Sequence, residues 1–209
     1  MDSQGYQFWN ATDACCGLYG SGVDDSAYVR GLIEEIIREY AVDRKRIHVT
    51  GHSNGGYMSY RLASDHADLI AGIASLAGFT FLDAAGRRPS EPVHVLHING
   101  TADEAVPYCG GIARGNPAFS PAALRTVQIW AGFNGCGGPV WDPQPVLDLD
   151  LGVPGLDTTV LRYTICPAGG AVELWTINGG THIPTFTEGT NSSEFSIRLI
   201  DWLLAHPRP

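Results

Sequence analysis

The sequence predicts an α/β domain with a mainly parallel sheet flanked by helices. Patterns typical of strands alternate with patterns typical of helices, and this alternation favours parallel strands joined by helical crossovers. Segments 69–78 and 92–98 are nearly unbroken apolar runs, as expected of strands buried on both faces. With 209 residues, 44% of them hydrophobic, the chain can build one sizeable core. We therefore expect residues 1–209 to form a single domain.

The first half of the chain indicates two helices and a short strand besides those apolar runs. Residues 24–43 predict an amphipathic helix with Asp24 or Asp25 as its N-cap. A short strand is expected over 46–50 and a second helix over 53–67. The apolar positions of the first helix, at spacings of three and four residues, are Val29, Leu32, Ile33, Ile36, Ile37 and Tyr40.

The second half predicts two helices and a β-hairpin. The helices are expected over 120–133 and 192–206, and the hairpin strands over 158–166 and 171–177. Ser120 is the expected cap of the first of these helices, with Pro121 in its first turn. The turn sequence PAGG separates the hairpin strands. Residues 134–157 are rich in Gly, Pro and Asp, so we expect a surface loop there.

Composition narrows the possible partners. Thirteen Lys plus Arg stand against 22 Asp plus Glu, and the formal net charge of −9 argues against a nucleic-acid partner. No apolar run approaches the roughly eighteen residues that a membrane helix needs, so we expect no membrane span. The low charge content, with 26 Gly and 13 Pro, is typical of a compact extracellular protein. The start MDSQGYQFWN has no signal-peptide pattern, so any export signal is expected to lie outside this sequence.

The five cysteines favour disulfides over a metal site. No Cys-x-x-Cys spacing occurs, and no metal ligand set is expected. Cys136 and Cys166 each end a predicted segment and could pair with each other. Cys109 could reach one of the adjacent residues Cys15 and Cys16, which leaves one thiol unpaired. The alternative is that all five are buried free cysteines of a cytosolic protein.

The stretch GHSNG lies between the first short strand and the second helix. A Gly-x-Ser-x-Gly sequence at such a turn is typical of a nucleophile elbow, in which the serine hydroxyl stands at the edge of the sheet. We expect side chains at Gly51 and Gly55 to collide with the neighbouring backbone of the tight turn. Ser53 is therefore the predicted nucleophile. The alternative is an ordinary helix-capping serine in a glycine-rich turn.

A serine hydroxyl is a weak nucleophile and needs an imidazole to take its proton. Among seven histidines, His182 follows the last predicted strand in a glycine-rich loop, which places it at the same sheet edge as Ser53. His182 is the predicted base, whereas His52 is expected to point away from the site. The other histidines are expected in the core or on helix surfaces: His48, His94, His97, His66 and His206.

The imidazole in turn needs a carboxylate that holds its tautomer and stabilises the imidazolium. Asp103 follows a buried strand directly and completes the chain order Ser, Asp, His. Glu104 is the nearest alternative. The remaining loop carboxylates are expected to be solvated turn residues: Asp83, Asp148, Asp150 and Asp157.

With these residues in place, the chain resembles the α/β-hydrolase superfamily, and specifically the polyhydroxybutyrate depolymerase and feruloyl esterase group of secreted serine esterases. The resemblance covers nearly the whole chain and is carried by FWNATDACCG, DDSAYVRGLIEEI, RIHVTGHSNGGYMSYRLA, HINGTADEAVPY, NGCGG with YTIC, and ELWTINGGTHIPTF. It implies Ser53 as nucleophile, Asp103 as orienting carboxylate, His182 as general base and a Cys136–Cys166 disulfide. The implied substrates are polyesters, such as polyhydroxyalkanoates or aromatic polyesters, or feruloyl-type aromatic esters.

The chain departs from this family before the nucleophile. Family members carry several strands there and a His-Gly turn whose N–H is the second oxyanion donor, so we expect an N-terminally shortened α/β-hydrolase fold. The backbone N–H of Asn54 is the expected first donor, and segment 6–17 or a second protomer the source of the other. An unpaired elbow strand is rarely tolerated. We therefore expect residues 1–23 to cover that edge, or a homodimer to form there.

Four aromatic residues are candidates for contacting an aromatic acyl group or a flat polymer: Tyr6, Trp9, Tyr108 and Trp141. The expected chemistry passes through an acyl-enzyme and requires neither metal nor cofactor. One alternative is an acyltransferase that uses the same triad. Another is an inactive remnant that binds a partner through its open sheet edge.

Overall fold

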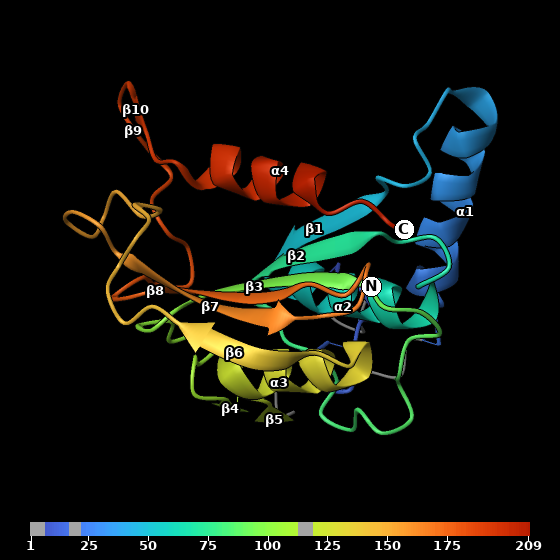
Figure 1. Cartoon of the computed structure of the whole chain (residues 1–209), viewed down its shortest axis with the longest axis horizontal. Helices are drawn as coiled ribbons and strands as arrows, with labels where there is room; N and C mark the ends of the chain where they lie inside the picture. The colour runs from blue at the N-terminus through green and yellow to red at the C-terminus, as the bar shows by residue number, and fades with distance from the viewer. Residues whose placement is uncertain (1–6, 17–21, 113–118) are drawn as a thin grey trace.

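Figure 1 shows the computed structural model of the chain, in which residues 7–16, 22–112 and 119–209 are described. A six-stranded sheet runs in the order β1-β2-β3-β8-β7-β6 through this part of the chain. Its strands are β1 (His48–His52), β2 (Gly72–Leu76), β3 (His94–Gly100), β6 (Gly137–Trp141), β7 (Thr158–Ile165) and β8 (Val172–Ile177). The helices are α1 (Asp25–Glu39), α2 (Asn54–Asp65), α3 (Ala123–Asn134) and α4 (Phe195–Ala205). Two small ladders pair β4 (Gly111–Ile112) with β5 (Phe119–Ser120) and β9 (Thr187–Glu188) with β10 (Asn191–Ser192).

The sheet confirms the predicted α/β architecture. Strands β1, β2, β3 and β8 are parallel, whereas β7 and β6 add two antiparallel strands at one side. The β7–β8 pair is the predicted hairpin. Helices α2 and α3 cover one face of the sheet and α4 covers the other (Figure 1). Both β2 and β3 are buried along their whole length, which explains their continuous apolar sequence.

Successive residues of the buried strands pack into two different hydrophobic clusters, one on each face of the sheet. Ile73 of β2 and Val95 of β3 pack with residues of α2 and α3, whereas Ala74 and Leu96 pack in a separate cluster with residues of α4. Because side chains alternate across a strand, one continuous apolar sequence supplies both layers.

Local contacts move several boundaries from the predicted positions. Strand β1 begins at His48 rather than residue 46, because the N–H of Arg46 closes a turn onto the Asp43 carbonyl. Ala122, not Ser120, is the N-cap of α3. The Ser120 hydroxyl instead forms a buried hydrogen bond of 2.7 Å with the hydroxyl of Tyr57.

The segment 134–157 is not a surface loop throughout. Residues 137–141 form β6, which pairs with β7 and carries Pro139 on the outermost strand, where a missing N–H is tolerated. Asp150 and Asp157 are buried rather than solvated. Each carboxyl group accepts hydrogen bonds from backbone N–H groups: Asp157 from residues 149 and 150, and Asp150 from residues 152 and 185.

The disulfide between Cys136 and Cys166 is present. The structure also joins Cys15 to Cys16 and leaves Cys109 as an exposed free thiol. The expected pairing of Cys109 with one of those two residues is therefore wrong, because the adjacent cysteines bond to each other.

Among the described residues, β1 and β6 are the two edge strands of the sheet, and β1 has β2 as its one strand neighbour. The predicted cover, residues 1–23, lies partly outside the described residues. The described part contacts α2: the N–H of Trp9 donates to Asn54 Oδ1 at 2.6 Å, and Arg61 donates to the carbonyl of Ala11 at 3.2 Å. These contacts place residues 9–11 against α2.

Candidate active site

Three loops at the carboxyl ends of β1, β3 and β8 carry the predicted catalytic residues. Ser53 follows β1 directly, Asp103 lies three residues after the end of β3, and His182 five residues after the end of β8. Because these strands are parallel, their carboxyl ends meet at one edge of the sheet. The structure brings all three side chains together there.

Ser53 occupies a strained turn. Its backbone has φ 55° and ψ −120°, a region that costs an L-residue free energy and is typical of a nucleophile elbow. A Cβ at Gly51 would lie 2.3 Å from the carbonyl carbon of Gly55, so only glycine fits at position 51. The same expectation for Gly55 is wrong, since a Cβ there would meet no atom within 4 Å. The steric restriction therefore applies to Gly51 at the end of β1, whose Cα faces the backbone of α2, and not to Gly55 in the helix.

A continuous hydrogen-bonded chain links the three residues. His182 Nε2 lies 3.0 Å from Ser53 Oγ, and His182 Nδ1 lies 2.9 Å from Asp103 Oδ2. An ionised carboxylate only accepts hydrogen bonds, so the Nδ1 hydrogen points to Asp103 and Nε2 is free to accept the serine proton. This is the tautomer that a general base requires.

The Asp103 carboxylate is buried and held in place by backbone groups. Its Oδ1 accepts hydrogen bonds from the N–H groups of Ala105 at 2.9 Å and Val106 at 2.7 Å, which leaves Oδ2 for His182. Glu104 is exposed, and the residue that bonds His182 is Asp103. Asp103, and not Glu104, is therefore the carboxylate that is fixed next to His182.

The loops that carry Asp103 and His182 touch each other closely. A Cβ at Gly100 would lie 2.1 Å from the carbonyl oxygen of Gly180, and that oxygen accepts the N–H of Ala102 at 2.9 Å. The glycine thus allows the backbones to approach and sets the distance between acid and base.

His52 does not point away from the site, contrary to the sequence prediction. Its Nε2 donates to the carbonyl oxygen of His182 at 2.7 Å, and the two ring centroids are 4.7 Å apart. Burial lowers the pKa of His52, which favours the neutral ring. The sequence signal that could have placed His52 at the site is its position directly before Ser53.

Asn54 begins α2, so its backbone N–H has no acceptor within the helix, as the predicted oxyanion donor requires. Its side chain is engaged elsewhere: Oδ1 accepts from Trp9 N, and Nδ2 donates to Trp9 O at 3.0 Å. Trp9, one of the predicted substrate contacts, is therefore tied to the residue after the nucleophile. Tyr6 lies outside the described residues.

Tyr108 and Trp141 do not line the groove that contains His182. That groove has a volume of about 520 Å³ and is bordered by Glu104, Ala105 and Ile183. Tyr108 and Trp141 line a different cavity beside α3. The structure therefore places these two predicted substrate contacts in a cavity other than the groove at His182, and their contact with substrate stays a prediction.

In the described ranges, no group of three or more His, Cys, Asp or Glu side chains is arranged to hold a metal ion. No helix of these ranges combines the length and the apolar content that crossing a bilayer requires.

Residues 22–94 match the prolyl oligopeptidase family. A feruloyl esterase B from Piromyces equi is 34% identical over 182 residues, which are 84% of this chain and 31% of that protein. A putative esterase, NocK, from Nocardia uniformis subsp. tsuyamanensis is 35% identical over 191 residues, which are 87% of this chain and 54% of that protein. The chain therefore spans between about a third and about half of the length of these relatives.

The acetyl xylan esterase from Aspergillus awamori has a similar solved structure. The TM-score is 0.57 at 15% sequence identity, and the match covers 95% of this chain and 74% of the other. At this identity the likeness concerns the fold alone. The chain is a member of the α/β-hydrolase superfamily. The elbow, the parallel sheet and the esterase-like relatives of this α/β-hydrolase all agree with that assignment.

Proposed function

We propose that this α/β-hydrolase is a serine carboxylic-ester hydrolase that works through an acyl-enzyme. The observation that carries the proposal is the hydrogen-bonded chain from Ser53 through His182 to Asp103, with separations of 3.0 Å and 2.9 Å. Esterases among the relatives support the same reaction class.

In the proposed mechanism, Ser53 Oγ attacks the carbonyl carbon of the ester while its proton passes to His182 Nε2. Asp103 stabilises the imidazolium that results. The developing oxyanion accepts the N–H of Asn54, and the segment around Trp9 is the proposed source of a second donor. His182 then protonates the leaving alcohol. In the second half, His182 takes a proton from water, which attacks the acyl carbon; the bond between this carbon and Ser53 Oγ breaks, His182 returns the proton to Oγ, and the acid is released.

The proposed substrates are esters of aromatic acids of the feruloyl type or polyesters. The first class is supported by the feruloyl esterase relative. The open groove beside His182, with Ile183 exposed at its rim, leaves room for a bulky substituent. We also propose a secreted protein, because the structure contains two disulfides and these persist in oxidising compartments.

The test is hydrolysis of p-nitrophenyl butyrate by the wild type and by Ser53→Ala. Removing the nucleophile should lower kcat by on the order of 10⁶-fold, whereas Asp103→Asn should lower it by about 10⁴-fold through the wrong tautomer. Ser64→Ala is the matched control, because that hydroxyl lies at the other end of α2 and has no hydrogen-bond partner in the described part of the chain. Equal activity of the wild type and Ser53→Ala would show that the triad assignment is wrong. Added glycerol distinguishes hydrolysis from acyl transfer by the products formed.

A further inference from the structure

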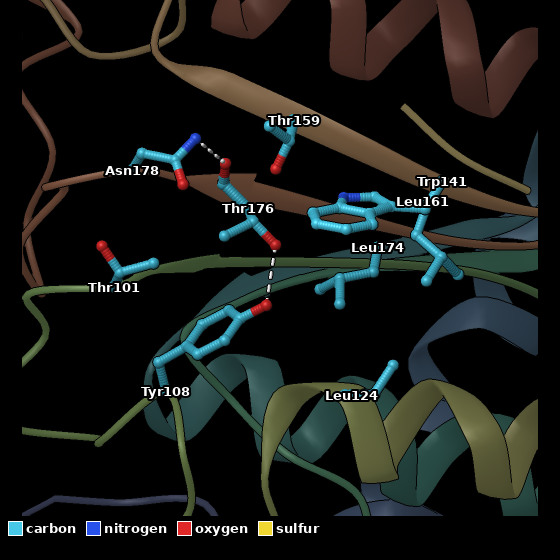
Figure 2. A pocket seen from close by; sticks show the side chains of 9 residues that line it. All are labelled: Thr101, Tyr108, Leu124, Trp141, Thr159, Leu161, Leu174, Thr176 and Asn178. Carbon is cyan, nitrogen blue, oxygen red and sulfur yellow. Dashed lines mark hydrogen bonds between the residues drawn. The ribbon is translucent and has the colours of Figure 1, made fainter. Parts of the chain in front are cut away.

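A second cavity, of about 430 Å³, lies on the α3 side of the sheet. Figure 2 shows side chains of β7, β8, α3 and the loop after β3 around it, together with Trp141 at the end of β6. None of the residues that line it is Ser53, Asp103 or His182, and it shares no lining residue with the groove at His182. It is therefore a separate candidate binding site.

The sheet provides a floor with an apolar row and a hydroxyl row. Trp141, Leu161 and Leu174 are direct cross-strand partners on β6, β7 and β8, so they share one face of the sheet. Two residues further along, Thr159 pairs with Thr176 on the same face. A ligand on this floor contacts hydrocarbon on one side and hydroxyl groups on the other.

Tyr108 and Leu124 form the opposite wall (Figure 2). The Tyr108 hydroxyl is 2.9 Å from Thr176 Oγ1, which fixes the ring above the hydroxyl row. Burial raises the pKa of Tyr108, so the hydroxyl stays protonated. No lining residue carries a formal charge, although the chain as a whole has a net charge of −9. A charged ligand would find no counter-ion here, so a neutral one is favoured.

Two polar groups at the cavity remain available for a ligand. Asn178 Nδ2 donates to the carbonyl of Asp157 at 2.7 Å, which orients the amide and leaves Oδ1 on the cavity side (Figure 2). The Thr159 hydroxyl points into the cavity and has no hydrogen-bond partner among the described residues. One acceptor and one hydroxyl thus lie near two aromatic side chains.

We propose that this cavity binds a neutral phenolic ring, which packs against Trp141, Tyr108 and the leucines while its hydroxyl bonds to Asn178 Oδ1 or Thr159. The space suffices, since a cavity of about 150 Å³ already holds benzene. Offset or edge-to-face packing on the two aromatic side chains favours a flat ring over a saturated one. Thr101 and Asn178, which line the cavity, belong to the loops after β3 and β8 that also carry Asp103 and His182.

The test titrates the Ser53→Ala protein with 4-ethylphenol by calorimetry, so its outcome does not depend on the proposed reaction. We expect saturable one-to-one binding. Methylating the ligand hydroxyl, as in 4-ethylanisole, should weaken binding by about threefold to tenfold through a lost hydrogen bond. The anion 3-(4-hydroxyphenyl)propanoate should also bind more weakly. An absence of saturable binding, or tighter binding of xylobiose than of 4-ethylphenol, overturns the proposal.

Variants of residues that line the cavity test whether 4-ethylphenol binds there. Trp141→Ala removes an exposed side chain and should weaken 4-ethylphenol binding by about tenfold. Thr159→Val preserves shape and should weaken binding of the phenol but not of 4-ethylanisole. The matched control is Val140→Ala, an exposed neighbour on β6 that does not line the cavity. Unchanged affinity in Trp141→Ala would mean that the ring binds elsewhere.

Discussion

His52 and His182 illustrate how single residues act at this site. The hydrogen bond from His52 Nε2 ends on the backbone of the proposed base, not on its ring. It therefore restrains the loop after β8 relative to the end of β1, and it holds the imidazole beside Ser53. We regard His52 as a positioning residue, since its ring contacts His182 through a hydrogen bond and a ring contact.

We expect His52→Phe to lower kcat while KM stays nearly unchanged. The phenyl ring keeps the packing against His182 but loses the hydrogen bond, which contributes about 1 kcal/mol, equivalent to roughly fivefold in rate. Steady-state kinetics on p-nitrophenyl butyrate measures both constants. His206→Phe is the matched control, because it breaks a similar hydrogen bond from the residue after α4 to the carbonyl of Trp202 within that helix, away from Ser53 and His182. A change in KM alone would contradict the positioning role.

Two buried histidines make the stability of the fold depend on pH. Burial lowers the pKa of His97 to about 3, and burial together with nearby His206 lowers the pKa of His94 to about 4. In the unfolded chain both titrate near 6.5, so the unfolded state binds more protons between these values. The stability that these groups contribute is complete above pH 6.5 and falls as the pH drops towards 4.

We expect the free energy of unfolding to decrease below pH 6.5 by up to about 1.4 kcal/mol per pH unit for each histidine. Urea unfolding at a series of pH values from 7.5 to about 4.5 measures this slope. In the double variant His97→Leu/Tyr60→Phe the slope should be smaller, because it removes the histidine together with the hydroxyl that bonds its Nδ1. A slope equal to that of the wild type would rule out His97 as its source.

At the scale of elements, the disulfide closes the antiparallel half of the sheet. Cys136 immediately precedes β6 and Cys166 immediately follows β7, and the first register pair of the two strands is Gly137 with Ile165. The bridge joins residues 30 positions apart, so it restricts the unfolded chain strongly. It also anchors the outermost strand, β6, which carries Trp141.

We expect Cys136→Ser/Cys166→Ser to lower the free energy of unfolding by about 3–4 kcal/mol, from the loop-closure entropy of a bridge of this span. Urea denaturation checks the value, and Cys109→Ser serves as the control because that thiol is exposed and free. If the double serine variant and the wild type unfold at the same urea concentration, the bridge does not stabilise the fold.

At the scale of the whole molecule, β1 is an edge strand of the sheet in the described part of the chain, and two helices present apolar stripes to solvent. On α1, Val29, Ile33 and Ile37 pack against the core, while Leu32, Ile36 and Tyr40 are exposed. On α4 the exposed apolar residues are Ile197, Ile200 and Leu204. An unpaired strand edge together with exposed apolar side chains favours association.

We propose that two copies of this chain pair through the β1 edge. Sedimentation equilibrium across a concentration series should then show a homodimer, and hydrogen exchange should show protected amides along β1. Leu32→Lys/Ile36→Lys should weaken the association if α1 takes part in it. A monomer at every concentration, with fast amide exchange along β1, would falsify the proposal.

The sequence by itself determined the parallel strands, the elbow and the identity of the three polar residues. Ser53, Asp103 and His182 each follow a strand whose apolar run is visible in the sequence, and the carboxyl ends of parallel strands share one edge. These features are local, because the period and continuity of apolar residues and the turn glycine at position 51 are encoded within a few neighbouring residues.

Only the tertiary structure decided which polar groups are buried, where the outermost strand lies and which aromatic residues share a cavity. Asp150 resembles a solvated turn residue in sequence, yet it is buried because the N–H of Thr185, 35 residues away, completes its hydrogen bonds. β6 contains two glycines and a proline and becomes a strand through pairing with β7. The physical reason is the same in each case: the stabilising partner is distant in the chain, so the local pattern carries no information about it.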